Sequence, residues 1–150
     1  MKPTVLLFDI DGTLVTTGGA GRRALGRSFE VMFGRADACT HFRFDGMTDR
    51  AIVRSGLQAI GEADSEDAID RVLSKYVAVL EEEVARVPDS RFYLHRGMLD
   101  ALDSAAGRSE YAIGLGTGNI REGAKVKLSR VGVHERFAFG GFGCDAEDRA

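Results

Sequence analysis

Cysteine, proline and tryptophan are scarce in this chain of 150 residues, which contains two cysteines, two prolines and no tryptophan. Cys39 and Cys144 are far apart and form no Cys-x-x-Cys pattern, which argues against a disulfide framework or a zinc ribbon. This cysteine usage predicts a reducing, cytoplasmic environment. No window approaches about 18 uninterrupted apolar residues, so we expect no membrane-spanning helix and no membrane partner. The first residues also lack the pattern of a signal peptide.

An excess of basic residues is also missing. Lysine and arginine total 20 and aspartate and glutamate total 23, for a net charge of −3, so we expect no nucleic-acid partner. Charged residues make up 29% of the chain, which is typical of globular proteins rather than disordered ones. Glycine is the abundant residue, at 19 of 150 positions. The length allows one core with at most one small additional lobe.

The apolar pattern predicts an α/β fold that a helical segment interrupts. Thr4–Phe8 is a continuous apolar run, which favours a buried strand of a parallel sheet. Helical spacing predicts three helices between residues 16 and 88. After Pro88 we expect helices over 97–106 and 120–131 and strands over 111–115 and 137–142. The predicted fold is an open, Rossmann-like parallel sheet formed by residues 1–15 and 89–150, with an all-helical domain, residues 16–88, inserted after the first strand.

The strongest chemical signal, Asp9-Ile10-Asp11-Gly12-Thr13, begins where the first strand ends. In open α/β sheets, ligands bind at the carboxyl ends of the strands. Asp9 and Asp11 are two residues apart and are expected to project to the same side, about 6.6 Å apart along the strand. Two carboxylates that close favour a bound cation, and oxygen ligands suit Mg²⁺. The alternative is that these side chains only cap a turn.

The segment Asp9–Val15, DIDGTLV, resembles the first motif of the haloacid dehalogenase-like hydrolase superfamily, whose phosphatases carry an Asp-x-Asp-Gly-Thr signature. The helical block at 16–88 is similar to the cap domain of the phosphoglycolate phosphatase and β-phosphoglucomutase branch. The stretch 114–119, GLGTGN, resembles the second motif, a strand that ends in threonine or serine. Together these features cover essentially the whole chain.

The resemblance implies a role for each matching residue. Asp9 would be the nucleophile that forms an aspartyl-phosphate, and Asp11 would be the general acid and base. Asp9 and Asp11 would also hold Mg²⁺. Thr117, Gly118 and Asn119 would bind the phosphoryl group, helped by the start of the following helix.

Gly46–Arg50 resembles the cap loop that reads the substrate in this branch, so Arg50 is expected to contact the far end of the substrate. The alternative is that Thr48 or Asp49 caps a helix and that Arg50 is solvated. We also expect solvated side chains at Lys125 and Lys127, and a solvated helix face at Glu81–Glu83.

The sequence departs from the family pattern after the third predicted strand. Family members place a lysine there, whereas residues 143–150 contain none, and Arg149 is the candidate replacement. The acidic pair that follows a fourth strand in the family also has no counterpart here. A chain that ended at this point would leave the first strand with a bare edge, so we expect this sequence to be part of a longer protein.

These observations predict a Mg²⁺-dependent phosphatase that acts on a small phosphorylated metabolite, such as phosphoglycolate or a sugar phosphate. One alternative is a phosphomutase, which would pass the phosphoryl group to a substrate instead of to water. Another is a non-catalytic domain that binds phosphate or a partner, which the missing acidic pair favours.

Overall fold

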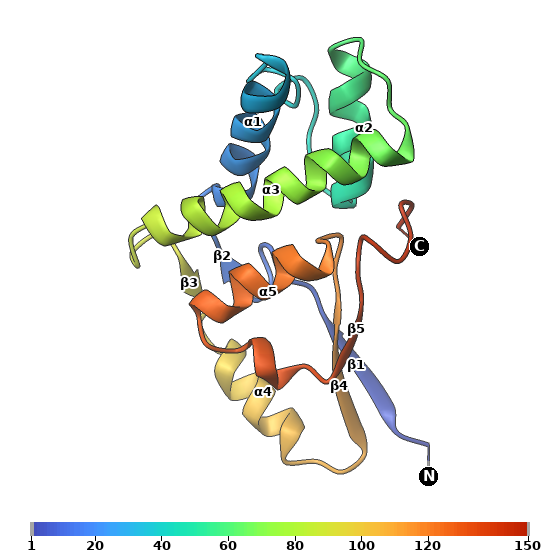
Figure 1. Cartoon of the computed structure of the whole chain (residues 1–150). Coiled ribbons are helices and arrows are strands. Elements are labelled where there is room, and N and C mark those ends of the chain that lie inside the picture. The colour runs from blue at the N-terminus through green and yellow to red at the C-terminus, as the bar shows by residue number, and fades with distance from the viewer. Residues whose placement is uncertain (1, 150) are drawn as a thin grey trace.

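The computed structural model describes residues 2–149, and it confirms the predicted α/β organisation with a helical insert (Figure 1). The α/β part begins with β1 (Thr4–Phe8) and β2 (Val15–Thr16). The insert contains α1 (Ala20–Phe33), α2 (Asp49–Ala59) and α3 (Glu66–Arg86). The chain then forms β3 (Tyr93–Leu94), α4 (Met98–Ala106), β4 (Tyr111–Gly116), α5 (Arg121–Arg130), a 3-10 turn at His134–Arg136 and β5 (Phe139–Gly141).

The main sheet is parallel and has the strand order β1-β4-β5. Figure 1 shows α4 and α5 on one side of this sheet. Its core contains residues from the turn after β1, from β4 and from both helices, among them Ile10, Leu102, Leu115 and Leu128. The sheet therefore buries one face and brings the carboxyl ends of β1 and β4 side by side.

The prediction that Thr4–Phe8 is a buried strand is correct for the strand and wrong for its burial. Val5 and Leu7 are 53% and 59% exposed, whereas Leu6 and Phe8 are half-buried. β1 lies at the edge of the sheet, and only alternate side chains of a strand face the covering helices. An uninterrupted apolar run therefore did not indicate cover on both faces.

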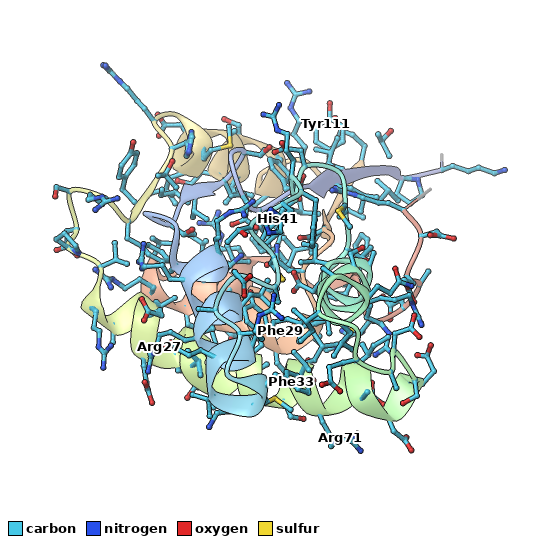
Figure 2. The ribbon with its side chains drawn as sticks, turned by 90° about the horizontal axis from the view of Figure 1, so that it is seen from above. Arg27, Phe29, Phe33, His41, Arg71 and Tyr111 are labelled. Atoms are coloured by element: carbon cyan, nitrogen blue, oxygen red, sulfur yellow. The ribbon has the colours of Figure 1, made fainter. Side chains whose placement is uncertain are left out.

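The helices α1, α2 and α3, with the loops that join them (residues 20–86), form a cap with its own apolar core. Figure 2 shows Phe29 and Phe33 on the side of α1 that faces α2, and Arg27 on the opposite side. Gly56 of α2 allows this close packing, because a Cβ atom there would lie 2.7 Å from the ring of Phe29. Local signals fix the helix ends: Thr48 and Ser65 cap α2 and α3 through their side chains.

The expectation of a solvated face at Glu81–Glu83 is wrong for Glu83. Its carboxylate is buried and accepts hydrogen bonds from Arg23 at 2.9 Å and Arg27 at 2.8 Å. These bonds join α1 to α3 in the cap.

The cap is fastened to the α/β part along α5. Arg130 donates from its guanidinium to the carbonyl oxygens of Val84 and Val87 at the end of α3. A short antiparallel ribbon pairs Val15 of β2 with Leu94 of β3 where the chain enters and leaves the cap. The division of the chain into domains at 16 and 88 stays a prediction. Within residues 2–149, no helix has both the length and the apolar character needed to cross a bilayer.

Candidate active site

The turn after β1 places Asp9 and Asp11 at one cavity of about 390 Å³ between the cap and the α/β part. Ile10, between them, is fully buried, and its carbonyl oxygen accepts hydrogen bonds from the amides of Thr13, Leu14 and Val15. This tight turn holds the segment in place and leaves the carboxylates of Asp9 and Asp11 at the cavity. The structure thus confirms that Asp9 and Asp11 face the same side.

The loop after β4 meets Asp11 because β1 and β4 are neighbours. Asn119 donates from Nδ2 to Asp11 Oδ2 and to Thr117 Oγ1, each at 2.8 Å. Thr117 and Asn119 are buried, and Gly118 and Asn119 line the cavity. The structure therefore brings all five residues predicted at the two strand ends to one place.

Lys127 of α5 is a site residue that the sequence reasoning missed. Its Nζ lies 3.0 Å from both carboxylate oxygens of Asp11 and 2.7 Å from Asn119 Oδ1, and its side chain is only 5% exposed. The expectation of a solvated Lys127 is wrong. Its position, one residue before the buried Leu128 and three after the buried Ala124, places it on the inner stripe of α5 and could have revealed it. Lys125, in contrast, is exposed.

Each of the two aspartates has a cationic partner. Arg149 donates from Nη2 to Asp9 Oδ2 at 3.1 Å, which agrees with the suggestion that Arg149 supplies a positive charge. Burial raises the pKa of Asp11, but the charge of Lys127 and hydrogen bonds from Asn119 and Lys127 outweigh that effect. The pKa of Asp11 therefore lies below its ordinary value, and Asp11 is ionised at neutral pH.

The segment that carries Arg149 is held by the cap helix α2. Arg54 donates to both carboxylate oxygens of Glu147, at 2.6 and 2.8 Å, and the hydroxyl of Thr48 donates to the Glu147 carbonyl. The amide of Gly143 donates to the carbonyl of Asn119 at 2.8 Å. The cap and the loop after β4 thus both fix the path of residues 143–149.

Asp49 joins the cap to the loop that was predicted to bind phosphate. Its Oδ2 accepts a hydrogen bond from the amide of Ile120 at 2.9 Å, and its own amide donates to the carbonyl of Gly118 at 2.8 Å. The contact is close, because a Cβ at Gly118 would lie 2.4 Å from the carbonyl oxygen of Met47. Burial raises the pKa of Asp49 to about 6. The amide of Ile120, expected to help bind phosphate, is therefore occupied by a cap carboxylate.

Arg50 does not line the cavity. It contacts Asp70 at 2.7 Å and also Glu66, both on α3, and its side chain is only 16% exposed. The alternative interpretation of this loop was that Thr48 or Asp49 caps a helix. Thr48 does cap α2. The cap cation that does line the cavity is Arg22 of α1.

The carboxylates of Asp9 and Asp11 can hold a divalent cation whose remaining ligands come from water and substrate. Within residues 2–149, no group of three or more His, Cys, Asp or Glu side chains is placed to hold a metal ion. Mg²⁺ is usually held by one or two carboxylates and completes its shell with water and substrate phosphate oxygens. Asp9 and Asp11 fit that requirement.

Comparison with solved structures gives the same fold. The chain superposes on CbbY from Rhodobacter sphaeroides, solved with phosphate, with a TM-score of 0.70 and 16% identity over 97% of this chain and 65% of that one. A predicted phosphoglycolate phosphatase from Haemophilus somnus 129PT gives 0.65 and 13% over 99% and 65%. A Bacteroides fragilis protein described as a haloacid dehalogenase-like hydrolase gives 0.60 and 20% over 99% and 67%.

The chain thus spans slightly less than two thirds of the length of the first two of these proteins. No protein-family model matches the sequence, and no curated protein matches it. The structural likeness nevertheless shows that this chain has the fold of the haloacid dehalogenase-like hydrolases, an α/β part with an inserted helical cap.

Proposed function

We propose that this protein is a Mg²⁺-dependent phosphatase that hydrolyses a small phosphorylated metabolite through an aspartyl-phosphate. The observation that supports this function best is the placement of Asp9 and Asp11 at one cavity, each beside a cation. Proteins with this fold include a predicted phosphoglycolate phosphatase and a protein solved with phosphate.

In the first step, a carboxylate oxygen of Asp9 attacks phosphorus while the bond from phosphorus to the ester oxygen breaks. Asp11 gives a proton to that oxygen, which leaves as an alcohol. Water then attacks the phosphorus of the aspartyl-phosphate, and Asp11 takes a proton from it. This step restores the Asp9 carboxylate and releases inorganic phosphate.

Positive charge is needed because an anionic nucleophile approaches an anionic phosphoryl group. Lys127 and Arg149 supply it from α5 and from the segment after β5, in place of the lysine that the family resemblance locates after the third strand. Asp9 and Asp11 would hold Mg²⁺, which when bound offsets the remaining repulsion between carboxylate and phosphate.

Lys127 also controls the protonation of Asp11. While Lys127 contacts both oxygens of Asp11, the pKa of Asp11 stays low and Asp11 cannot act as an acid. A bound phosphoryl group competes for the same ammonium group, which has three donors. When Lys127 turns toward the phosphoryl oxygens, the pKa of Asp11 rises and Asp11 can carry the proton that the first step needs.

The test is phosphate release from an aryl phosphate with and without Mg²⁺, using the full chain and an Asp9→Asn variant. We expect turnover that requires Mg²⁺ and falls by more than about 10³-fold in the variant. Asp45→Asn is the matched control, because Asp45 lines the same cavity but pairs with the exposed Arg43. A hydroxylamine-sensitive phosphoenzyme should form with the native chain and not with Asp9→Asn. Equal turnover by the native chain and Asp9→Asn would contradict the mechanism.

The second candidate is a non-catalytic phosphate-binding domain. It is favoured by the lack of a third carboxylate beside Asp9 and Asp11 in the described part of the chain. Binding of inorganic phosphate without any turnover would support it. A phosphomutase would instead move label from a sugar phosphate to a second position on a sugar, which product analysis detects.

A further inference from the structure

Asn119 is the residue that connects the polar groups around Asp11. Its Nδ2 donates to Asp11 Oδ2 and to Thr117 Oγ1, each at 2.8 Å, and its Oδ1 accepts a hydrogen bond from Lys127 Nζ at 2.7 Å. A side-chain amide has two N–H donors, so both are already used. Although Asn119 lines the cavity, its side chain has no donor left for a phosphoryl oxygen.

The neighbours of Asn119 fix the orientation of its side-chain amide. Reversing the amide would place its donors against the Lys127 ammonium group and its oxygen against the Asp11 carboxylate. Thr117 Oγ1 also accepts a hydrogen bond from the backbone amide of Asn119 at 3.1 Å. The carbonyl oxygen of Asn119 accepts a further hydrogen bond from the amide of Gly143 at 2.8 Å. Backbone and side chain of Asn119 are therefore both held in place.

Lys127 depends on Asn119 for its direction, because the stem of a lysine side chain is flexible. The three donors of its ammonium group meet the two oxygens of Asp11, at 3.0 Å each, and Asn119 Oδ1. Asp11 alone would let the ammonium group move around the carboxylate, whereas a third acceptor on a separate residue fixes its place. When a phosphoryl oxygen takes over a contact from Asp11, the bond to Asn119 keeps Nζ beside the reacting atoms.

We propose that Asn119 is a positioning residue, which directs Lys127 toward the reacting phosphoryl group and holds Asp11 without contacting the phosphoryl group through its own side chain. This inference rests on the proposed function, in which Lys127 supplies positive charge and Asp11 transfers the proton. It replaces the expectation that Asn119 binds phosphate, and it leaves that role to Thr117 and Gly118.

The Asn119→Ala variant of the full chain tests this role, with Gln58→Ala as the matched control. Gln58 also donates from its side-chain amide to a carboxylate oxygen, Asp64 Oδ2 at 2.8 Å, but on the exposed surface of the cap. Asn119→Ala should lower kcat for an aryl phosphate by about 10- to 10²-fold and change KM by less than about 3-fold, because displacement of a catalytic group slows the reaction more than it weakens binding. A kcat equal to that of Gln58→Ala would overturn the proposal.

The affinity for inorganic phosphate, measured by calorimetry, separates positioning from direct binding. The proteins are the native chain, Asn119→Ala, Lys127→Met and the double variant. If Asn119 acts through Lys127, adding Asn119→Ala to Lys127→Met should change the affinity by less than about 2-fold, because the group that Asn119 directs is already missing. A side chain that binds phosphate itself would lower the affinity by about 5-fold or more, and by the same factor, in both backgrounds. That result would also overturn the proposal.

Unfolding of the same four proteins in urea keeps this inference separate from the proposed function. The double variant should be less destabilised than the product of the single effects, by about 5-fold in the unfolding equilibrium constant, because both changes break one hydrogen bond. Asn119→Ser, whose single hydroxyl cannot make all three bonds, should behave like Asn119→Ala in every assay. If no aryl phosphate is hydrolysed, the proposed function fails, and unfolding still decides whether Asn119 holds Lys127. Single effects that simply multiply would show that it does not.

Discussion

Replacing Lys127 with methionine measures the contribution of the positive charge that α5 places in the site. Methionine keeps much of the apolar stem of lysine, so the change removes chiefly the ammonium group and its contacts to Asp11 and Asn119. Lys125→Met is the matched control, because Lys125 lies on the same helix and is exposed. The two variants lose the same formal charge, and only one loses it inside the site.

The expected loss of stability is small and the expected loss of activity is large. Asp11 is half-exposed, so water can replace part of the lost contact, and we expect a cost of only about 1 kcal/mol at neutral pH. The native pKa of Asp11 lies below its unfolded value, so its pairing stabilises the fold above the unfolded pKa. That contribution disappears as the pH falls through the folded pKa, so the stability gap between native and variant should close in acid.

For activity, removing one preorganised charge from a transition state costs about 10²- to 10³-fold in kcat. Without Lys127 the pKa of Asp11 rises, so Asp11 keeps the proton that the first step needs up to a higher pH, and the alkaline limb of the pH–rate profile should move to higher pH. The assay is kcat for an aryl phosphate between about pH 4 and pH 9, with urea unfolding of both variants. A kcat for Lys127→Met that matches Lys125→Met, or an unmoved alkaline limb, would refute the assignment of Lys127 to the site.

Three further predictions concern the junction between the cap and the α/β part. Because burial raises the pKa of Asp49 to about 6, the folded chain binds a proton that the unfolded chain does not in the window between 3.8 and about 6. Native stability should therefore gain up to about 3 kcal/mol from this group as the pH falls through that window, a gain that urea unfolding of Asp49→Asn should lack. Gly118→Ala should cost about 1–3 kcal/mol in unfolding free energy, because its Cβ meets a cap carbonyl; Gly107→Ala, whose Cβ would lie 3.6 Å from its nearest neighbour, should not. Arg54→Met and Glu147→Gln should each expose residues 143–149 to limited proteolysis, and combining them should add little, because they break the same ion pair.

Local patterns predicted the elements and the first half of the site. The polar residues Thr48 and Ser65 precede helical spacing and cap α2 and α3, as such residues do in many helices. The abrupt change from apolar strand to Asp9 and Asp11 located the strand end, and parallel neighbours bring strand ends together. Each of these inferences depends on a few adjacent residues or on a general rule of sheet topology.

The cations were harder to predict, because their roles depend on partners far away in the sequence. Lys127 is 116 residues from Asp11, and nothing beside it distinguishes it from the solvated Lys125 except its place on the buried stripe of α5. Arg22 and Arg50 both belong to the cap, but α3 presents acids to Arg50 and none to Arg22. The burial of the β1 side chains likewise depends on which elements pack against the strand, and the sequence of the strand alone does not specify those elements.

The ion pair at Asp9 depends on contacts that the cap makes. Arg149 reaches Asp9 from a segment that Arg54 of the cap holds through Glu147, and Asp49 of the cap binds the loop whose Asn119 contacts Asp11. A movement that lifts α2 would break the Arg54–Glu147 and Asp49–Ile120 contacts together, since Arg54 and Asp49 both belong to that helix. The segment that carries Arg149 would then lose its contacts with the cap, while Lys127, carried by α5, stays with Asp11. The two aspartates therefore differ in a physical sense: the charge balance of Asp11 is built into the α/β part, whereas that of Asp9 comes from a segment that the cap and the loop after β4 hold together.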